Sequence, residues 1–466
     1  MTMIEVRRKR QFSLVIAFIG ALFASILIGF SLYQQSDMGT LLLVIFISLI
    51  ISLVGINKFG LSRFLFYSAL FGLTLGWRGI DVGSKIKIYP SEIFIWLALF
   101  FGLIDRKKAG IVTIPKNSSL IPFLLLASIS ILGMIIGFSK GRNPNSVLYE
   151  GKTFLLFLPL LPLVRKLIKN PNELKRALLI LVISACLISI IGIFEYVIPS
   201  LFSNVLGLSQ NLEYARVNFT GDGRMSLIKL SGFLLWGTPV VSVILVPILP
   251  FSLIQTVDER GSKKLLWLSC SLAITTGIIL SGYRSAWLGL AVVIIAFFIL
   301  YSKKLIPFFV FLGVGLTNLP TGFLNRFTMI SSFANSSDTA TIRRTTEIEK
   351  LLSSFTGKNI FGTGWASPAV FNDWLYIYVV LGLIGLLIFV FLYGRNIVML
   401  LGVKTENTEN RDLKVSLLIS LLSYAICMVS GAMSQVFPLM ATFWLIFMIA
   451  WQGPQVLSEK ESRGKI

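Results

Sequence analysis

The chain lacks histidine entirely and carries few charged residues. None of its 466 residues is histidine, and only 14% are Asp, Glu, Lys or Arg. The usual general acid–base side chain and a common zinc ligand are therefore missing. Soluble domains carry about a quarter charged residues, so an ordinary soluble enzyme and a disordered chain are both excluded. Cysteine is scarce as well, and because Cys186, Cys270 and Cys427 all lie in apolar stretches, a disulfide-stabilised secreted scaffold is excluded too.

What the sequence has in abundance is apolar surface. Apolar residues make up 55% of the chain, and the mean hydropathy is +0.84. A membrane-spanning helix needs about 20 mostly apolar residues, and fourteen stretches qualify, although the third and fourth are also consistent with tilted or re-entrant segments. We therefore predict an all-α polytopic membrane helix bundle of 12–14 transmembrane helices, forming one domain over residues 1–466. The predicted spans are 12–33, 40–57, 62–76, 91–104, 119–138, 153–168, 177–197, 232–255, 265–280, 285–301, 305–318, 374–394, 413–431 and 436–451.

The basic residues predict how the chain crosses the bilayer. The net charge is +21, from 42 Lys+Arg against 21 Asp+Glu. If the N-terminal cluster Arg7–Arg10 is cytoplasmic, 27 of the 42 basic residues fall in inside segments and 15 outside, as the positive-inside rule requires. The excess charge then reflects topology and implies no nucleic-acid partner. Two outer segments are long, 198–231 and 319–373, and the second contains a predicted amphipathic helix over 338–355.

Arginines on the outer side are the first candidates for a binding site. Arg284 lies in a short turn between two apolar stretches, where an ionisable group is costly and suggests function. Arg343 and Arg344 are adjacent on the predicted amphipathic helix, and Arg224 lies in the 198–231 loop. A guanidinium fork suits phosphate oxygens, so these four residues are predicted to bind a diphosphate. The alternatives are an interfacial anchor for Arg284 and a solvated helix face for the Arg343–Arg344 pair.

Asp373 is the candidate general base. Without histidine, the base that activates a hydroxyl must be Asp, Glu, Lys or Tyr, and Asp373 lies at the outer edge of a predicted span. The segment before it contains Gly362 and Gly364, which we predict to form a flexible loop that closes over substrate. The alternative for Asp373 is a helix cap or first-turn residue favoured by the helix dipole.

Two strings and their order add a resemblance. Residues 361–390 read FGTGWASPAVFNDWLYIYVVLGLIGLLIFV, and residues 280–290 read LSGYRSAWLGL. Together they resemble the O-antigen polymerase/O-antigen ligase family (the Wzy and WaaL group). Its C-terminal signature is G-x-G, then H-N-x-x-L, then E-x-G-x-x-G, preceded by an arginine and by an earlier G-S-R turn. The matching residues here are Arg224, Arg284, Arg344, Gly362, Gly364, Asn372, Leu375, Gly382 and Gly385.

The resemblance implies a bacterial inner-membrane protein with both termini cytoplasmic. It implies a metal-independent, cofactor-free inverting glycosyltransferase of polysaccharide biosynthesis in the cell envelope. Its substrates would be polyprenyl-diphosphate-linked oligosaccharide repeats, and the bilayer and a chain-length regulator would be partners. Aromatic residues near the signature, Trp365, Trp374 and Tyr376, would stack on sugar faces, or else form an aromatic belt at the membrane interface.

Two positions depart from the family signature. Phe371 stands where ligases have histidine, and Val380 stands where the signature has glutamate. These departures favour a polymerase over a ligase. A ligase remains the enzymatic alternative. A flippase or transporter of lipid-linked sugars is the alternative from another class, and it would be expected to show an internal repeat and charges at the bilayer midplane.

Overall fold

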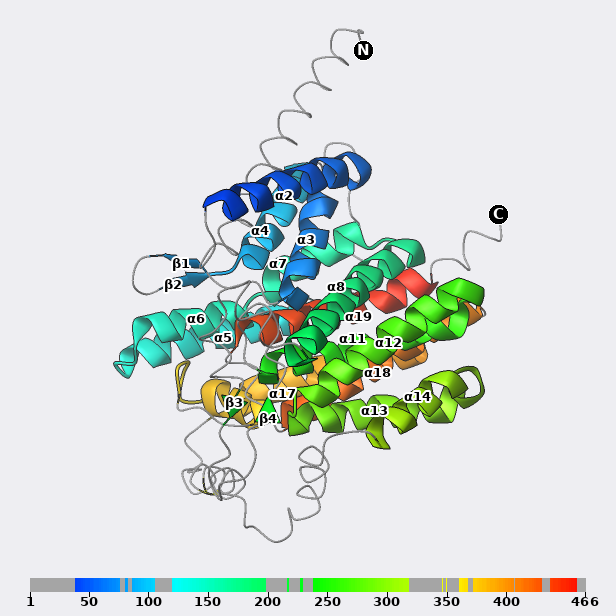
Figure 1. Ribbon diagram of the computed structural model, residues 1–466. Helices are drawn as coiled ribbons and strands as arrows, with labels where there is room; N and C mark the ends of the chain where they lie inside the picture. Colours follow the sequence, from blue (N-terminus) through cyan, green and yellow to red (C-terminus); the bar gives the residue numbers. More distant parts are fainter. Residues whose placement is uncertain are drawn as a thin grey trace, which may run out of the picture.

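The computed structural model describes residues 38–75, 80–82, 86–104, 120–197, 216–217, 227–228, 238–317, 346, 349, 360–367, 372–405, 407–429 and 436–458. Figure 1 shows a bundle of helices with two small hairpins at its margin. The helices are α2 (Met38–Phe59), α3 (Leu61–Leu75), α4 (Pro90–Ile104), α5 (Ile121–Ser139), α6 (Pro144–Phe154), α7 (Phe157–Leu167), α8 (Pro171–Val197), α11 (Thr238–Asp258), α12 (Gly261–Leu280), α13 (Arg284–Tyr301), the 3₁₀ turn η2 (Ser302–Lys304), α14 (Ile306–Thr317), α17 (Asp373–Gly402), α18 (Thr408–Val429) and α19 (Phe437–Ser458).

The prediction of an all-α polytopic membrane bundle is confirmed. Within the described part of the chain, nine helical segments are long and apolar enough to cross a membrane: α5, α6 with α7, α8, α11, α12, α13, α17, α18 and α19. Four shorter apolar helices, α2, α3, α4 and α14, correspond to further predicted spans. The predicted span 12–33 lies outside the described residues. Lipid offers no hydrogen-bond partner to the backbone, so each apolar run satisfies its own peptide groups as a helix.

The structure adds two hairpins and moves some boundaries. Strand β1 (Ile80–Val82) pairs antiparallel with β2 (Ile86–Ile88), and β3 (Arg216–Val217) pairs antiparallel with β4 (Leu227–Ile228). Both hairpins lie in connections predicted to be outside, and they are too short to form a layer of their own. Helix α17 runs eight residues past its predicted end at 394. The predicted span 153–168 is two helices, α6 and α7, that meet at a break after Phe154.

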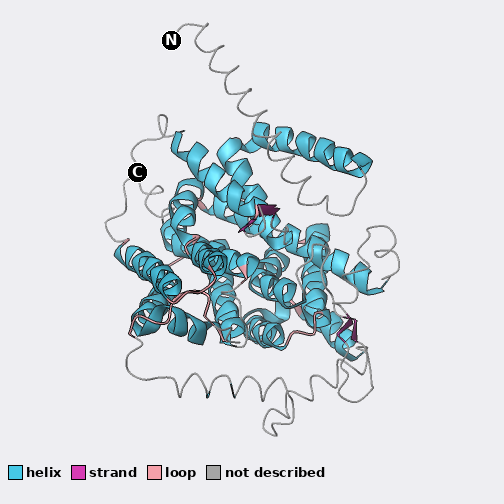
Figure 2. Cartoon of the chain, turned by 90° about the vertical axis from the view of Figure 1, so that its left-hand side faces the viewer, coloured by secondary structure: helices cyan, strands magenta, loops and turns pink. Residues whose placement is uncertain are grey.

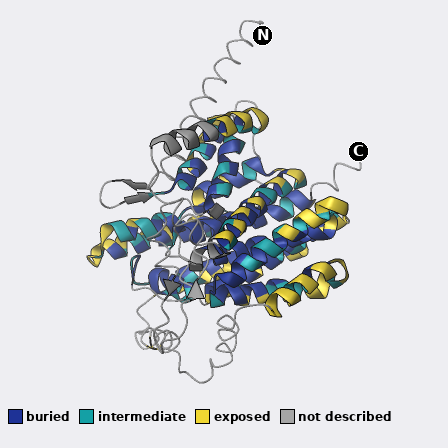
Figure 3. Ribbon diagram, in the orientation of Figure 1, coloured by how far each residue is buried: buried dark blue, intermediate teal, exposed yellow. Residues whose placement is uncertain are grey.

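Helix α19 is the centre of the bundle. Of its most apolar 18-residue window, 94% is buried, and Figure 3 shows buried residues in the middle of the molecule with exposed ones on outlying helices such as α2 and α14. Its aromatic side chains pack against those of neighbouring helices: Trp444 lies 4.8 Å from Phe157 and 5.5 Å from Phe154, measured between ring centroids. Tyr393 of α17 stacks on Phe443. The core is therefore aromatic and is built around a helix that lipid barely touches.

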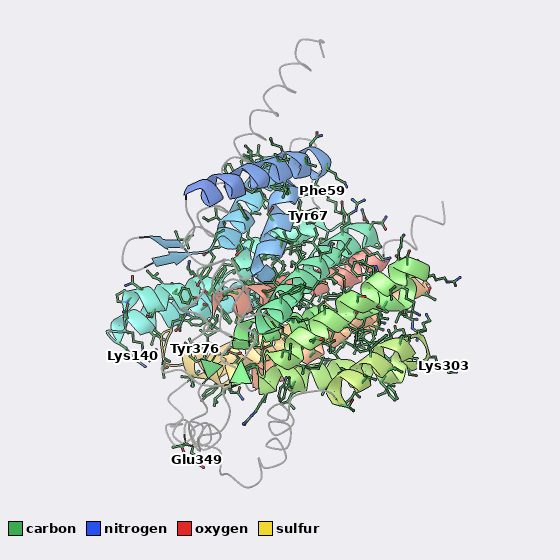
Figure 4. All side chains as sticks on the ribbon, viewed as in Figure 1. Phe59, Tyr67, Lys140, Lys303, Glu349 and Tyr376 are labelled. Carbon is green, nitrogen blue, oxygen red and sulfur yellow. The ribbon has the colours of Figure 1, made fainter. Side chains whose placement is uncertain are left out.

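Residues predicted to lie on opposite sides of the membrane mark the two ends of the bundle. Figure 4 places Lys140, predicted outside, and Lys303, predicted inside, at opposite ends. We call these the predicted outer end and the predicted inner end. Figure 2 views the bundle from the predicted outer end, with several helices nearly end-on. The described ion pairs join residues of one end only: Arg63–Glu173 and Lys175–Glu409 at the inner end, and Lys152–Glu92 at the outer end.

Candidate functional site

The segment 360–367 lies between α5 and α17 at the predicted outer end. Its backbone N–H groups donate to carbonyls of both helices. The Thr363 N–H donates to the Val379 carbonyl at 2.7 Å, and the Gly364 N–H to that of Val380 at 3.0 Å. On the other side, the Trp365 N–H donates to the Gly133 carbonyl of α5 at 3.1 Å. The segment is therefore a strap that joins two helices distant in sequence.

Glycines make this close contact possible. Helix α17 is interrupted at Gly382, whose φ of 74° and ψ of −174° are not helical, and Gly362 has a φ of 76°. A Cβ at Gly382 would collide with the Ile360 carbonyl, and one at Gly362 with the Val380 carbonyl. Glycine alone combines these backbone angles with this approach. The Gly362–Gly364 segment is thus docked against α17, which differs from the flexible closing loop that we predicted.

Arg142 clamps the strap from the turn between α5 and α6. Its Nη1 donates to the carbonyls of Gly364 and Trp365, at 2.6 and 2.8 Å, and to the Ser367 hydroxyl at 2.7 Å. Burial lowers the pKa of Arg142 from its ordinary value, while Tyr376 and Glu150 oppose that shift. The guanidinium stays charged at neutral pH, so these are charge-assisted hydrogen bonds.

Glu150 of α6 holds the other side of the strap. Its Oε2 accepts the Ala366 N–H at 2.8 Å and also the hydroxyl hydrogen of Tyr376. Ala366 has a φ of 57°, a conformation that costs free energy for a residue with a side chain. The Glu150 hydrogen bond stabilises this strained position. One carboxylate therefore links α6, the strap and α17.

Two aromatic residues predicted to contact sugar are buried instead. Trp365 is fully buried and donates its Nε1–H to the Ser130 carbonyl at 2.9 Å, while its ring packs on Phe154. Tyr376 is fully buried as well, with its hydroxyl on Glu150. Both side chains are committed to the core, so the sugar-stacking prediction is wrong for them. Trp374 is half-buried, and its Nε1–H donates to the Ala425 carbonyl of α18 at 3.3 Å.

Asp373 is the first residue of α17 and is fully buried. The helix cap is its neighbour Asn372, whose Oδ1 accepts the Leu375 N–H at 3.0 Å. Of the two structural alternatives for Asp373, capping is therefore wrong and a first-turn position is correct. The carboxylate lies close enough to Tyr376 and to Tyr424 of α18 to interact with both electrostatically.

Arg284 begins α13 and is half-buried. The next residue, Ser285, accepts a hydrogen bond at its carbonyl from the Cys427 thiol of α18, at 3.4 Å. Cys427 follows Tyr424, which interacts electrostatically with Asp373, by one turn of the same helix. The start of α13, which carries Arg284, therefore contacts the same stretch of α18, residues 424–427, with which Asp373 of α17 interacts electrostatically.

The remaining predicted site residues lie outside the described part of the chain. They are Arg224, Arg343 and Arg344. Thr346 and Glu349, the described residues of the predicted amphipathic helix, are helical and exposed. Among the described residues, no cluster of His, Cys, Asp and Glu is arranged to hold a metal ion.

Arg142 was not singled out from the sequence, and Glu150 is one of the outer carboxylates, with Glu195, Glu213 and Asp222, that the sequence offers as general base in place of Asp373. The partners of Arg142 and Glu150 lie more than 200 positions away in the chain, and no local pattern marks such a contact. The one available signal is placement, because both lie in the short connection between two apolar runs. Comparisons with models of known protein families and with curated proteins find no match to this chain.

Proposed function

We propose that the protein is a glycosyltransferase that polymerises polyprenyl-diphosphate-linked oligosaccharide repeats on the outer face of a bacterial inner membrane. The resemblance of the 280–290 and 361–390 strings to the O-antigen polymerase/ligase family suggests the reaction class. The absence of histidine and glutamate from the two signature positions, occupied by Phe371 and Val380, favours polymerase over ligase.

The observation that carries the proposal is that the start of α13, which bears Arg284, and Asp373 of α17 are both linked to one stretch of α18. A cation and a carboxylate at the predicted outer end, supplied by different helices, are the two groups that this transfer needs. The strap, held by Arg142 and Glu150, fixes the start of α17 through Tyr376, which lies one turn after Asp373. Such support from packed neighbours is what a catalytic side chain requires to keep its position.

The proposed reaction is a displacement at the anomeric carbon. A hydroxyl of one lipid-linked repeat attacks C1 of the sugar on the donor, the C1–O bond to the diphosphate breaks, and the diphosphate leaves with the bonding electron pair. Asp373 accepts the hydroxyl proton, and Arg284 stabilises the charge that develops on the leaving diphosphate. Because Asp373 is fully buried, the acceptor hydroxyl reaches it only after the surrounding side chains open.

The test is complementation of a deletion strain, read by electrophoresis of surface glycan. Deletion should abolish the ladder of polymer lengths and leave single-repeat material. Asp373→Asn removes the proton acceptor but leaves the Asn372 cap intact, so we expect polymerisation to fall about 10²–10⁴-fold at normal protein level. Arg284→Lys keeps the charge and loses the bidentate fork, and it should also lose the ladder.

Matched controls come from the predicted inner end. Arg260 precedes α12 and Glu409 lies in the first turn of α18, so Arg260→Lys and Glu409→Gln make the same chemical changes away from the site. Both should keep a normal ladder. A normal ladder from Asp373→Asn rejects the assigned base, and loss of single-repeat material together with the ladder in the deletion strain points to a ligase or a flippase instead.

A further inference from the structure

A cavity of about 390 Å³ lies at the predicted inner end, where α2, α3 and α8 meet. Figure 4 labels two of its residues, Phe59 and Tyr67, on the side of the bundle remote from Tyr376 and the candidate site. The lining side chains are Lys58, Phe59, Tyr67, Arg176, Leu179 and Ile180. Cations and apolar groups therefore share one hollow, and among the described residues no carboxylate lines it.

The two cations are not neutralised by the acidic residues nearby. Glu173 pairs with Arg63, and Glu409 pairs with Lys175. Within the described part of the chain, neither Lys58 nor Arg176 forms an ion pair. The Lys58 ammonium lies 5.4 Å from the centre of the Phe59 ring, a cation–π contact that leaves its N–H groups available to an oxygen ligand.

An apolar track leads away from the cavity along α8. Leu179 and Ile180 line the cavity itself. Ile183, Leu187 and Ile190 follow at three- and four-residue steps and are 43%, 41% and 38% exposed. At 1.5 Å per residue, the ten residues from Ile180 to Ile190 extend about 15 Å, which is half the thickness of the roughly 30 Å hydrocarbon core. The track thus has the length of one acyl chain in one leaflet.

We propose that this cavity binds an anionic phospholipid of the inner leaflet. Arg176 and Lys58 contact the phosphate oxygens, and one acyl chain lies along the α8 track. Basic pockets between helices at the cytoplasmic surface suit such headgroups, and guanidinium matches phosphate geometry. The N-terminal segment carries Arg7–Arg10, so its charge repels the cavity and does not complement it. This inference is independent of the proposed glycosyltransferase activity.

The experiment uses the purified full-length protein in neutral detergent, with native mass spectrometry to count bound lipid. We expect the protein to retain phosphatidylglycerol at least about tenfold more strongly than phosphatidylcholine, since about 1 kcal/mol per basic residue is typical at a membrane surface and 1.4 kcal/mol is tenfold. Lys58→Gln with Arg176→Gln should abolish this preference, and Lys58→Arg with Arg176→Lys should keep it. Arg260→Gln with Lys263→Gln, which alters one exposed arginine and one exposed lysine at the same end, is the matched control and should behave as wild type.

A second variant tests the apolar half of the site. Leu179→Trp fills the cavity and leaves both cations, so it should also lose phosphatidylglycerol. Unchanged phosphatidylglycerol retention by Leu179→Trp, or by Lys58→Gln with Arg176→Gln, overturns the proposal. Displacement of phosphatidylglycerol by millimolar inorganic phosphate overturns it as well, because the cavity would then be a site for free phosphate. Retention that appears only when residues 1–37 are removed would mean that the N-terminal segment fills the cavity, and this result would also reject it.

Discussion

Replacement of Arg142 by alanine should release the strap from α5 and α17. One guanidinium nitrogen shares its two N–H groups among three acceptors in the strap, the carbonyls of Gly364 and Trp365 and the Ser367 hydroxyl. A hydrogen bond from a charged group contributes about 1.5–3 kcal/mol. The three share one half-buried donor group and are not additive, so we take the loss as about 2–3 kcal/mol of the free energy that keeps the strap closed. This corresponds to an increase of about 30- to 150-fold in the population of the open strap.

Hydrogen exchange of the full-length protein in nanodiscs measures that population. The amides of Thr363, Gly364 and Trp365 donate to carbonyls of α17 and α5, so they exchange only when the strap opens. We expect their exchange to accelerate by about 30- to 150-fold in Arg142→Ala and by less in Arg142→Lys. The control is Lys140→Ala, which removes an exposed charge two residues away. Equal exchange in Arg142→Ala and Lys140→Ala would refute the clamp, because the backbone hydrogen bonds and glycines would then hold the strap unaided.

Two further predictions concern stability, measured by thermal unfolding in detergent. Gly382→Ala should lower the midpoint temperature of unfolding, since the added Cβ would collide with the Ile360 carbonyl and the backbone angle costs about 1–3 kcal/mol for alanine. Gly394→Ala, in the same helix, has open space around it and should raise this temperature through helix propensity. A fall of similar size in both would contradict this reasoning. Glu173→Ala leaves Arg63 without its partner and removes a backbone N–H acceptor, so it should cost about 2 kcal/mol. Glu409→Ala, in a more exposed pair, should cost less than about 1 kcal/mol, and an equal loss in the two would count against the burial argument.

The helices were predictable from the sequence because lipid offers no hydrogen-bond partner to the backbone. An apolar run of sufficient length must satisfy its own backbone, so α5, α8 and α12 lie close to their predicted spans. The break in α17 was not predictable, since Gly382 departs from helical angles to accommodate the Ile360 carbonyl of a segment 22 residues earlier. Glycine is common in membrane helices, and although Gly382 matches the family signature, nothing in the local pattern marks it as the site of a helix break.

The candidate site was predictable only in part, because some of its contacts join residues that are far apart in the chain. Arg284 and Asp373 stand out because a charge at the edge of an apolar run is costly. Which residue caps α17 was not evident, because Asn372 and Asp373 are adjacent and both residue types cap well. The fates of Trp365 and Tyr376 depend on contacts with Ser130 and Glu150, more than 200 positions away, that only the folded chain brings together.

The central position of α19 has a consequence for how the protein is made. This helix packs against α3, α6, α7, α8, α11, α17 and α18, and every one of them precedes it in the chain. Synthesis delivers segments in order, N-terminal first, so these helices enter the bilayer before the element that they surround exists. Until α19 arrives, side chains that later bury Trp444 and Phe443 face lipid or one another, and the bundle is open along its axis. Closure of the whole domain therefore awaits one late segment, and an amino-acid change in α19 acts on biogenesis before it acts on the finished protein.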